Sequence, residues 1–447
     1  MKLKCSAVLL LVALAFTQAR AQTSPEKLEA LCKPLKAPKP AGLQLMKGDR
    51  LAICGDSITE QKMYSRIMED YLTMCVPELE ISVRQYGWGG ERAGGFLARM
   101  TNDCLRFKPT IATTCYGMND HEYRAYEERV GQTYREKSEA IVEAFKANGV
   151  RVIQGSPGCI GKVPGWTKHT NDTVVDLNAN LCHLRNIGIE IAENEQVGFA
   201  DVFWPMLTAG MEARQKYGPD YAIAGKDGVH PGWAGHAVMA YAFLKAMGLK
   251  GEIGTFTVDL KKNTIKLSEG HELVSSKDGE FEIKSSRYPF CECAEPGTAA
   301  AGYPVCGKDS WSKDSSIHSG AGLVSFDPDL NRLMLVGKGG KAQHYTVIWA
   351  GEAKTIRAEQ LARGVNLVEL FPNINPFCQA FGRVDGAVAA KQAFETKEIK
   401  ELFRSSDAKN DMEGVASRSE QERAKLVAAI KEAFVPVVHR IRIEAVD

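Results

Sequence analysis

Two segments of the sequence carry residue types that could work together in nucleophilic catalysis. Gly55-Asp56-Ser57 follows an apolar run and opens a helical pattern, so Ser57 would stand at a strand-to-helix turn whose amides favour negative charge. Asp227 and His230 share a later loop, three residues apart. A nucleophilic serine needs a base, and the base needs a carboxylate that orients it. Taken singly, the first segment is equally typical of a helix N-cap, and the second is typical of a surface turn.

Two further segments could supply hydrogen-bond donors for an oxyanion. Residues 85–90 (QYGWGG) contain glycines that let a backbone amide approach a substrate closely, with Gly90 favoured by spacing and Gly89 as the alternative. Asn119, in the segment 117–120 (GMND), offers a side-chain amide. A tight turn and an Asx turn are the structural alternatives. All four segments follow expected strands or precede the last expected helix of one region, so together they indicate a catalytic site.

A parallel sheet would bring these segments together. Between residues 49 and 250, short apolar runs alternate with helical patterns, which is typical of a parallel sheet covered by helices on both faces. Such sheets bind ligands at the carboxyl ends of their strands. The expected strands are 51–54, 81–86, 110–116, 150–153 and 197–203, and the expected helices are 65–74, 96–107, 130–147, 173–193 and 233–247.

The pattern changes after residue 250. Alternation with a period of two predicts an antiparallel, sandwich-like module, with strands that include 255–260, 264–267, 281–284, 345–349 and 365–370. Residues 384–434 predict a helical pair. The charges from Lys391 to Lys431 have both signs, so we expect a solvated face there.

The N-terminus has the form of a secretory signal peptide. Lys2 and Lys4 precede an apolar run of about ten residues, which is too short to span a membrane, and residues 19–21 (ARA) fit a cleavage site. We therefore expect a signal peptide at 1–21, a surface linker at 22–48, a catalytic domain at 49–250 and a β-rich module at 251–447. The mature protein is expected to be secreted or periplasmic, without stable membrane insertion.

Charge and cysteine usage limit the other classes. The 56 Lys and Arg residues balance the 55 Asp and Glu residues, so no net field would gather nucleic acid. Of 12 cysteines, 11 remain without Cys5, and an odd number leaves at least one free or paired between chains. Cys54 and Cys115 lie in expected strands and are predicted to be buried thiols. Residues 291–293 (CEC) favour a disulfide-stapled loop over a metal site, because zinc ligands have a different spacing.

Over residues 49–250 the chain resembles the SGNH hydrolases, also called GDSL esterases/lipases. Gly55-Asp56-Ser57, the segment 117–120 and the Asp227/His230 pair match three motifs of that family. The second motif departs from the pattern, because the family usually has an Asn where this chain has Gln85.

The resemblance implies a flavodoxin-like three-layer α/β/α sandwich and a role for each site residue. Ser57 would be the nucleophile, His230 the base and Asp227 its orienting partner. The oxyanion hole would consist of the amides of Ser57 and Gly90 and the side chain of Asn119. No metal or organic cofactor would be required.

The leading hypothesis is an exported serine esterase that hydrolyses O-acyl esters, most simply O-acetyl esters, on carbohydrate. A lipase, lysophospholipase or thioesterase acting on lipids is the enzymatic alternative, and it would need an apolar groove beside Ser57. A carbohydrate-binding or cell-surface protein is the non-enzymatic alternative. Trp166, His169 and Asn171 lie in a long insertion that could contact substrate, whereas Trp88 is expected to pack and His121 to be solvated.

Overall fold

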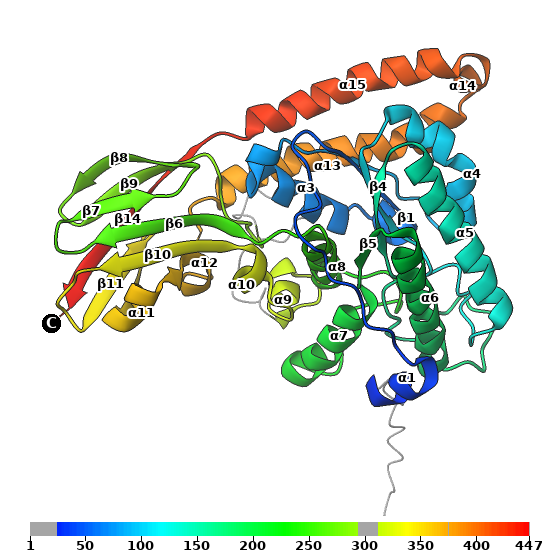
Figure 1. The fold of residues 1–447 in the computed structure, drawn as a ribbon, viewed down its shortest axis with the longest axis horizontal. Coiled ribbons are helices and arrows are strands. Elements are labelled where there is room, and N and C mark those ends of the chain that lie inside the picture. Colours follow the sequence, from blue (N-terminus) through cyan, green and yellow to red (C-terminus); the bar gives the residue numbers. More distant parts are fainter. Residues whose placement is uncertain (1–24, 294–311, 374, 447) are drawn as a thin grey trace, which may run out of the picture.

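The computed structural model describes residues 25–293, 312–373 and 375–446 (Figure 1). The predicted signal peptide and Cys306 lie outside these ranges. Within them, none of the helices combines the length and the apolar character that a membrane crossing requires.

A five-stranded parallel sheet forms the centre of the first half of the chain. Its strand order is β2-β1-β3-β4-β5. The helices on its two faces belong to different core clusters: Leu51 and Ile53 of β1 lie in one, whereas Ala52 and Cys54 lie in the other. Alternate side chains of one strand therefore enter separate cores, which confirms the expected α/β/α sandwich. The strands are β1 (Arg50–Gly55), β2 (Ser82–Gln85), β3 (Ile111–Cys115), β4 (Arg151–Gly155) and β5 (Gly198–Ala200).

The helices of this half include the five expected ones and add α1, α2 and α7. They are α1 (Pro25–Cys32), α2 (Ser57–Glu60), α3 (Tyr64–Met74), α4 (Ala93–Asp103), α5 (Glu128–Ala147), α6 (Val174–Glu195), α7 (Phe203–Tyr217) and α8 (Trp233–Ala246). The four-residue helix α2 was not anticipated as a separate element, and it follows directly from β1.

Two sheets form the β-rich module at the other end of the molecule (Figure 1). One has the order β13-β10-β6-β7 and the other β12-β11-β14-β9-β8. All pairs are antiparallel as predicted, except that β6 and β10 are parallel, because a long excursion separates them in the chain. The strands are β6 (Glu252–Asp259), β7 (Thr264–Leu267), β8 (His271–Lys277), β9 (Glu280–Ser285), β10 (Arg332–Lys338), β11 (His344–Trp349), β12 (Glu352–Arg357), β13 (Val365–Asn366) and β14 (Val437–Val446).

The predicted strand at 365–370 is wrong beyond its second residue. β13 ends at Asn366, whose side chain accepts a hydrogen bond from the Val368 amide and begins a helix there. A side-chain cap outweighs the strand-like alternation of this segment. The helices of this half are α9 (Ile317–Ala321), α10 (Phe326–Leu330), α11 (Ala358–Arg363), α12 (Leu367–Leu370), α13 (Cys378–Lys400), α14 (Ser406–Asn410) and α15 (Met412–Ala433).

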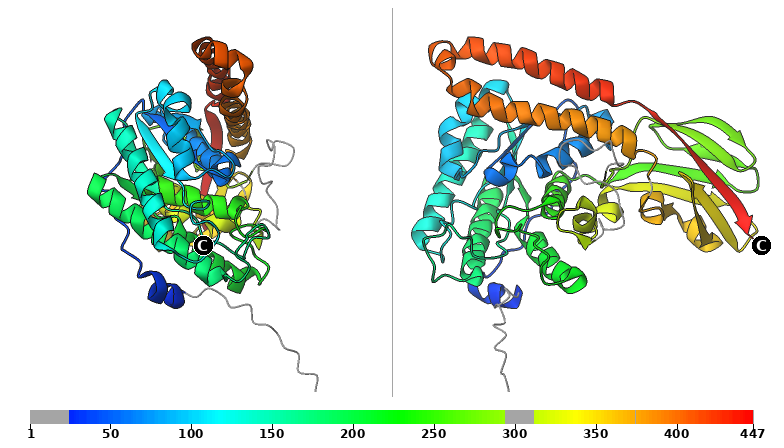
Figure 2. Two further views of the ribbon diagram at one scale, coloured as in Figure 1. Left: turned by 90° about the vertical axis from the view of Figure 1, so that its right-hand side faces the viewer. Right: turned by 180° about the vertical axis from the view of Figure 1, so that it is seen from behind.

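The predicted helical pair, α13 and α15, lies along the α/β half of the molecule rather than on the β sheets (Figures 1 and 2). The predicted solvated face is wrong for one side of α13, because Lys391, Glu395 and Glu398 are at most 1% exposed. The Lys391 ammonium lies 3.1 Å from Glu69 of α3, and Glu398 lies 2.5 Å from Arg84 of β2. Charged side chains can be buried when each has a partner of opposite sign, and here the partners come from the α/β half.

These helices also complete the edge of the parallel sheet. β2 is the edge strand, so one row of its backbone groups has no neighbouring strand. Glu395 accepts a hydrogen bond from the Gln85 amide at 3.1 Å, and Lys391 donates to the Val83 carbonyl at 2.8 Å. Arg423 of α15 donates to the same carbonyl at 2.7 Å. Charged side chains therefore satisfy the groups that a further strand would otherwise pair.

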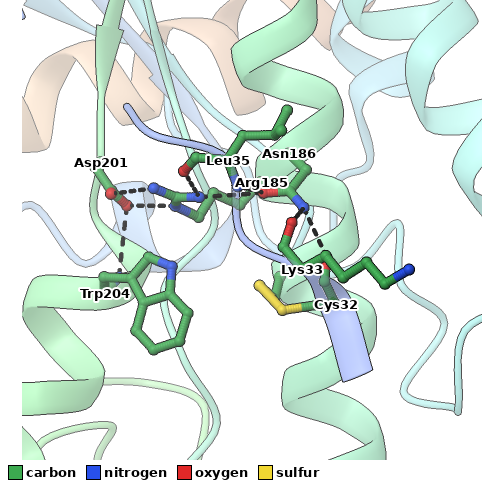
Figure 3. Close-up of a disulfide and its surroundings, with 8 residues drawn as sticks. Cys32, Lys33, Leu35, Arg185, Asn186, Asp201 and Trp204 are labelled. Carbon is green, nitrogen blue, oxygen red and sulfur yellow. Dashed lines mark hydrogen bonds and ion pairs between the residues drawn. A yellow bond between two sulfur atoms is a disulfide. The ribbon is translucent and has the colours of Figure 1, made fainter. Parts of the chain in front are cut away.

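The expected linker at 22–48 is partly structured. Helix α1 carries Cys32, which forms a disulfide with Cys182 of α6, and Asn186 donates to the Cys32 carbonyl at 2.9 Å (Figure 3). The Pro- and Lys-rich composition suggested a linker, but the disulfide and the buried Leu28 attach this segment to the domain.

The other cysteine predictions can be compared with the structure. Cys54 and Cys115 are free and buried, as expected. Cys293 is disulfide-bonded, in line with the disulfide favoured for the CEC segment, whereas Cys291 is a buried cysteine outside that disulfide. Over the described ranges, no group of three His, Cys, Asp or Glu side chains is arranged to hold a metal ion.

Candidate active site

Ser57, His230 and Asp227 form a continuous hydrogen-bonded chain. Ser57 Oγ lies 2.8 Å from His230 Nε2, and His230 Nδ1 lies 2.7 Å from Asp227 Oδ2. This is the arrangement in which an imidazole can accept the serine proton while a carboxylate orients the ring. The structure therefore brings Ser57 to the Asp227/His230 pair, although Ser57 and His230 are 173 positions apart in the chain.

The position of Ser57 follows from the turn between β1 and α2. Asp56, not Ser57, is the N-cap of α2, and its Oδ1 accepts a hydrogen bond from the Ile58 amide at 2.9 Å. A Cβ at Gly55 would lie 2.1 Å from Thr59 Oγ1, so the turn requires glycine there. The alternative role of Ser57 as a helix cap is thus wrong, and its hydroxyl is free to meet His230.

The loop before α8 holds the Asp227 carboxylate in place. Oδ1 accepts hydrogen bonds from the amides of Val229 and His230, both at 2.9 Å, which leaves Oδ2 for the imidazole. Burial alone would raise the pKa of Asp227, but these hydrogen bonds outweigh it, so that the pKa lies below its ordinary value. The Asp227 carboxylate is therefore ionised at neutral pH and can orient the imidazole.

The structure distinguishes among the three glycines of the second motif. The Gly87 amide donates to Gln85 Oε1 at 2.5 Å, and the Gly89 amide donates to the Glu60 carboxylate. Gly90 has a positive φ of 72°, and its amide makes no hydrogen bond to any residue that the structure describes. Gly90 is thus the glycine with an uncommitted donor, as the spacing suggested.

Asn119 lies at the end of β3 with its amide fixed on both sides. Nδ2 donates to the Glu91 carbonyl at 3.1 Å and to Asp56 Oδ2 at 3.4 Å, and Oδ1 accepts a hydrogen bond from the Tyr123 hydroxyl at 3.0 Å. Because the oxygen is occupied by a hydroxyl donor, the amide is held with its nitrogen toward the motif that contains Gly90. Tyr123 was not identified from the sequence, although a tyrosine four residues after Asn119 was a visible signal.

Two buried carboxyl groups lie behind these donors. Burial raises the pKa of Asp56 to about 7 and that of Asp120 to about 6. Asp120 accepts hydrogen bonds from the amides of Gly117 at 2.9 Å and Ala93 at 3.0 Å, which ties the third motif to the start of α4. Repulsion from Asp120 adds to the rise for Asp56, so Asp56 ionises less readily than an exposed carboxyl group.

The insertion after β4 brings an aromatic side chain to the triad. The Trp166 ring centroid lies 6.0 Å from that of His230 and 5.8 Å from that of Tyr123, and the residue is 49% exposed. Thr167 donates a hydrogen bond to the Tyr123 carbonyl at 2.9 Å, which anchors the insertion. For His169 and Asn171, no side-chain contact with the triad occurs in the described structure.

Two neighbouring residues differ in how well they were predicted. His121 is fully buried, with Nδ1 2.5 Å from the Met118 carbonyl, so the expected solvated histidine is wrong. Burial lowers its pKa to about 4. Trp88 packs as expected, with the cationic groups of Arg99, Lys400 and Arg404 between 5.1 and 5.3 Å from its ring centroid.

Comparison with known proteins adds a family and a fold. Residues 53–238 match the model of the GDSL-like lipase/acylhydrolase family. No curated protein matches the chain. Among solved structures, the chain is similar to BT4096, described as a gut microbial diltiazem-metabolizing enzyme. The TM-score is 0.69 at 22% identity, over 92% of this chain and all of the other. Because the second half is also covered, the shared fold includes the β-rich module and the helical pair.

Two shorter enzymes match less than half of this chain. LAE5, an α/β hydrolase from the metagenome of Lake Arreo, Spain, has a TM-score of 0.37 at 22% identity, over 46% of this chain and 98% of its own. Axe2, an acetylxylan esterase from Geobacillus stearothermophilus, has a TM-score of 0.38 at 22% identity, over 46% and 97%.

The region from 53 to 238 is a GDSL-like lipase/acylhydrolase domain. This confirms the resemblance that the sequence motifs carried. The match to an acylhydrolase family supports hydrolysis of an ester bond by this region.

Proposed function

We propose that this protein is an exported serine esterase that removes small O-acyl groups, most simply O-acetyl groups, from carbohydrate. The observation that carries the proposal is the hydrogen-bonded chain Ser57–His230–Asp227. In the same site, the Gly90 amide is left uncommitted.

The reaction begins with attack of Ser57 Oγ on the ester carbonyl while His230 Nε2 accepts the hydroxyl proton. The amides of Ser57 and Gly90 and the Asn119 side chain hold the oxyanion that forms. His230 then returns the proton to the departing sugar oxygen, which leaves an acyl-enzyme. Water attacks this ester, with His230 again as base, and releases the acid and the free serine. Throughout, Asp227 stabilises the charged imidazole.

The carbohydrate substrate is supported by the surroundings of His230. Trp166 presents a half-exposed indole beside the imidazole. An indole face can pack against the apolar face of a sugar ring. Trp166 is also the one large exposed apolar side chain in the described loops that follow β1 to β4, whereas a long acyl chain would need several.

Export is supported by cysteine chemistry. Besides the signal-peptide pattern in the sequence, the Cys32–Cys182 disulfide and the disulfide-bonded Cys293 suit an oxidising compartment. We therefore place the mature protein in the periplasm or outside the cell.

An acyl-length and alcohol series tests the proposal. Initial rates on 4-nitrophenyl acetate, butyrate and octanoate should fall as the chain lengthens, and acetylated xylo-oligosaccharides should be better substrates than lysophospholipid or acyl-coenzyme A. A preference for octanoate, or for either lipid substrate, would instead support the lipid alternative. Trp166→Ala should raise KM for the acetylated sugar about 3- to 10-fold. The same change should leave hydrolysis of ethyl acetate nearly unaltered, with His169→Ala as the matched control from the same insertion.

A further inference from the structure

We propose that the C-terminal helical pair positions the oxyanion hole of the esterase site, and that Lys400 is the positioning residue through which it acts. Residues 87–91 are called the oxyanion loop below. This inference rests on the proposed function and assigns a role in it to the second half of the chain.

The first contact between the helical pair and the oxyanion loop runs through Glu60. This residue ends α2, the helix that begins with Ser57. One of its carboxylate oxygens lies 2.5 Å from the Lys400 ammonium, and the other accepts the hydrogen bond of the Gly89 amide. A single carboxylate therefore connects the nucleophile helix, the oxyanion loop and the end of α13.

The second contact runs through Trp88. Its ring packs against the ammonium of Lys400 at 5.2 Å and the guanidinium of Arg404 at 5.3 Å, both from the helical pair region. Arg404 is itself held by two hydrogen bonds to Asp103, at 2.9 and 2.6 Å. The Trp88 amide donates to the Gly55 carbonyl at 3.0 Å, so this contact also reaches the turn before Ser57.

The direction of α13 explains why Lys400 arrives at the site. The helix follows β2 toward the carboxyl edge of the sheet: Lys391 contacts Val83, Glu395 contacts Gln85, and Lys400 follows at the loop. The buried contacts with β2 fix the helix upstream. Its last residue is therefore delivered to a defined place rather than to a mobile tail.

The oxyanion loop depends on such support because three of its five residues are glycines. Glycine adds conformational freedom that must be restricted for an amide to act as a preorganised donor. As long as Glu60 holds the Gly89 amide, the Gly90 amide remains the free one. Without Lys400, the Glu60 carboxylate loses its charge partner and the loop loses one side of the Trp88 packing. A donor displaced by a fraction of an ångström stabilises the oxyanion less, while the ground-state ester is bound nearly as before.

The test compares Lys400→Met with Lys397→Met. Lys397 lies on the same helix, is exposed, and forms no ion pair within the described structure. We expect Lys400→Met to lower kcat on 4-nitrophenyl acetate about 10-fold with KM within about 2-fold, and Lys397→Met to change neither. Lys400→Arg should retain most of kcat. Glu60→Gln should not multiply the loss when it is combined with Lys400→Met.

A readout independent of catalysis separates this inference from the proposed function. Amide hydrogen exchange of the peptide covering the oxyanion loop should be faster in Lys400→Met and unchanged in Lys397→Met. Equal exchange and equal kcat in the two variants would overturn the positioning role, whereas a wild-type protein without esterase activity would overturn the proposed function alone. A loss of kcat in Lys400→Met that is matched by an equal loss of thermal stability and by a raised KM would also overturn it, because it would indicate a purely structural contact.

Discussion

The catalytic loops and the α13 interface both assemble polar residues from distant parts of the chain, but they do so in different ways. Ser57 and His230 meet across 173 positions at an exposed edge, where loops deliver them from strand ends. Arg66 and Asp385 meet across 319 positions inside the protein, on the surfaces of two helices. The loops are marked by short motifs, whereas the helix face looks like any solvent-exposed charged surface. Charge composition alone therefore does not reveal whether a helix face is solvated.

The two regions also differ in how their surroundings shift the pKa values of acidic side chains. At the site, Asp227 is partly exposed and receives three hydrogen bonds, so its ionised form is stabilised. In the interface, Asp70 is fully buried next to Asp385, and burial with that repulsion raises the pKa of Asp70 well above its ordinary value. The interface is thus balanced by pairing some charges and protonating others.

Removal of the nucleophile should have the largest effect of all the changes, and it should affect catalysis alone. Ser57→Ala should lower kcat/KM on a soluble acetyl ester by about 10⁴- to 10⁶-fold, because it removes the hydroxyl that is hydrogen-bonded to the His230 imidazole. Folding should be unaffected, as judged by circular dichroism and thermal unfolding. Wild-type turnover in a folded Ser57→Ala protein would refute the assignment of the triad.

A change in the interface should affect stability instead of catalysis. Asp385→Ala leaves Arg66 buried without its carboxylate, which should lower the free energy of unfolding by about 3–5 kcal/mol in urea titrations. Asp407→Ala, on the exposed surface of α14, is the matched control and should cost less than about 0.5 kcal/mol. If the two variants were equally stable, α13 would not be held by buried ion pairs.

Loss of one oxyanion donor should be smaller than loss of the nucleophile. Asn119→Ala should reduce kcat about 10²- to 10³-fold with little change in KM, since the donor acts mainly on the transition state. Steady-state kinetics on the same acetyl ester provides the measurement, and Asn171→Ala in the nearby insertion provides the control. A change confined to KM would place Asn119 in substrate binding rather than in the oxyanion hole.

The last effect depends on pH and concerns the buried Asp56. Its folded pKa of about 7 lies above the ordinary value of 3.8, so the folded state retains a proton that the unfolded state has lost. This contribution to stability is complete below pH 3.8 and is lost as the pH rises through about 7. Relative to wild type, Asp56→Asn should gain stability between pH 4 and 8, with a slope of up to about 1.4 kcal/mol per pH unit.

Asp227→Asn is the internal control for that slope. The pKa of Asp227 is lowered, so the group is ionised in both states above pH 4 and adds no slope in this window. Parallel urea titrations at several pH values would show this difference. A flat comparison for Asp56→Asn would mean that the carboxyl is ionised in the folded protein.

Most of the α/β half and the residues of the triad could be predicted because their signals are local. The strands of residues 50–200 show as apolar runs separated by helical patterns, and the rules of parallel sheets place their carboxyl ends together. Ser57 and Asn119 follow such runs, and His230 precedes the last helix. All three could therefore be assigned to one edge of the sheet from the sequence alone. The sequence by itself therefore determined the fold of this half and the chemistry that its edge could perform.

The remaining features depended on which distant segments meet. The burial of Lys391, the disulfide of Cys32 and the Trp166 ring beside His230 each require a partner that no local pattern specifies. Spacing favoured Gly90 over its neighbours, and the hydrogen bonds of the Gly87 and Gly89 amides leave the Gly90 amide as the uncommitted one. Only the tertiary structure could decide these points, because burial and donor availability are properties of a packed environment and not of the residue alone.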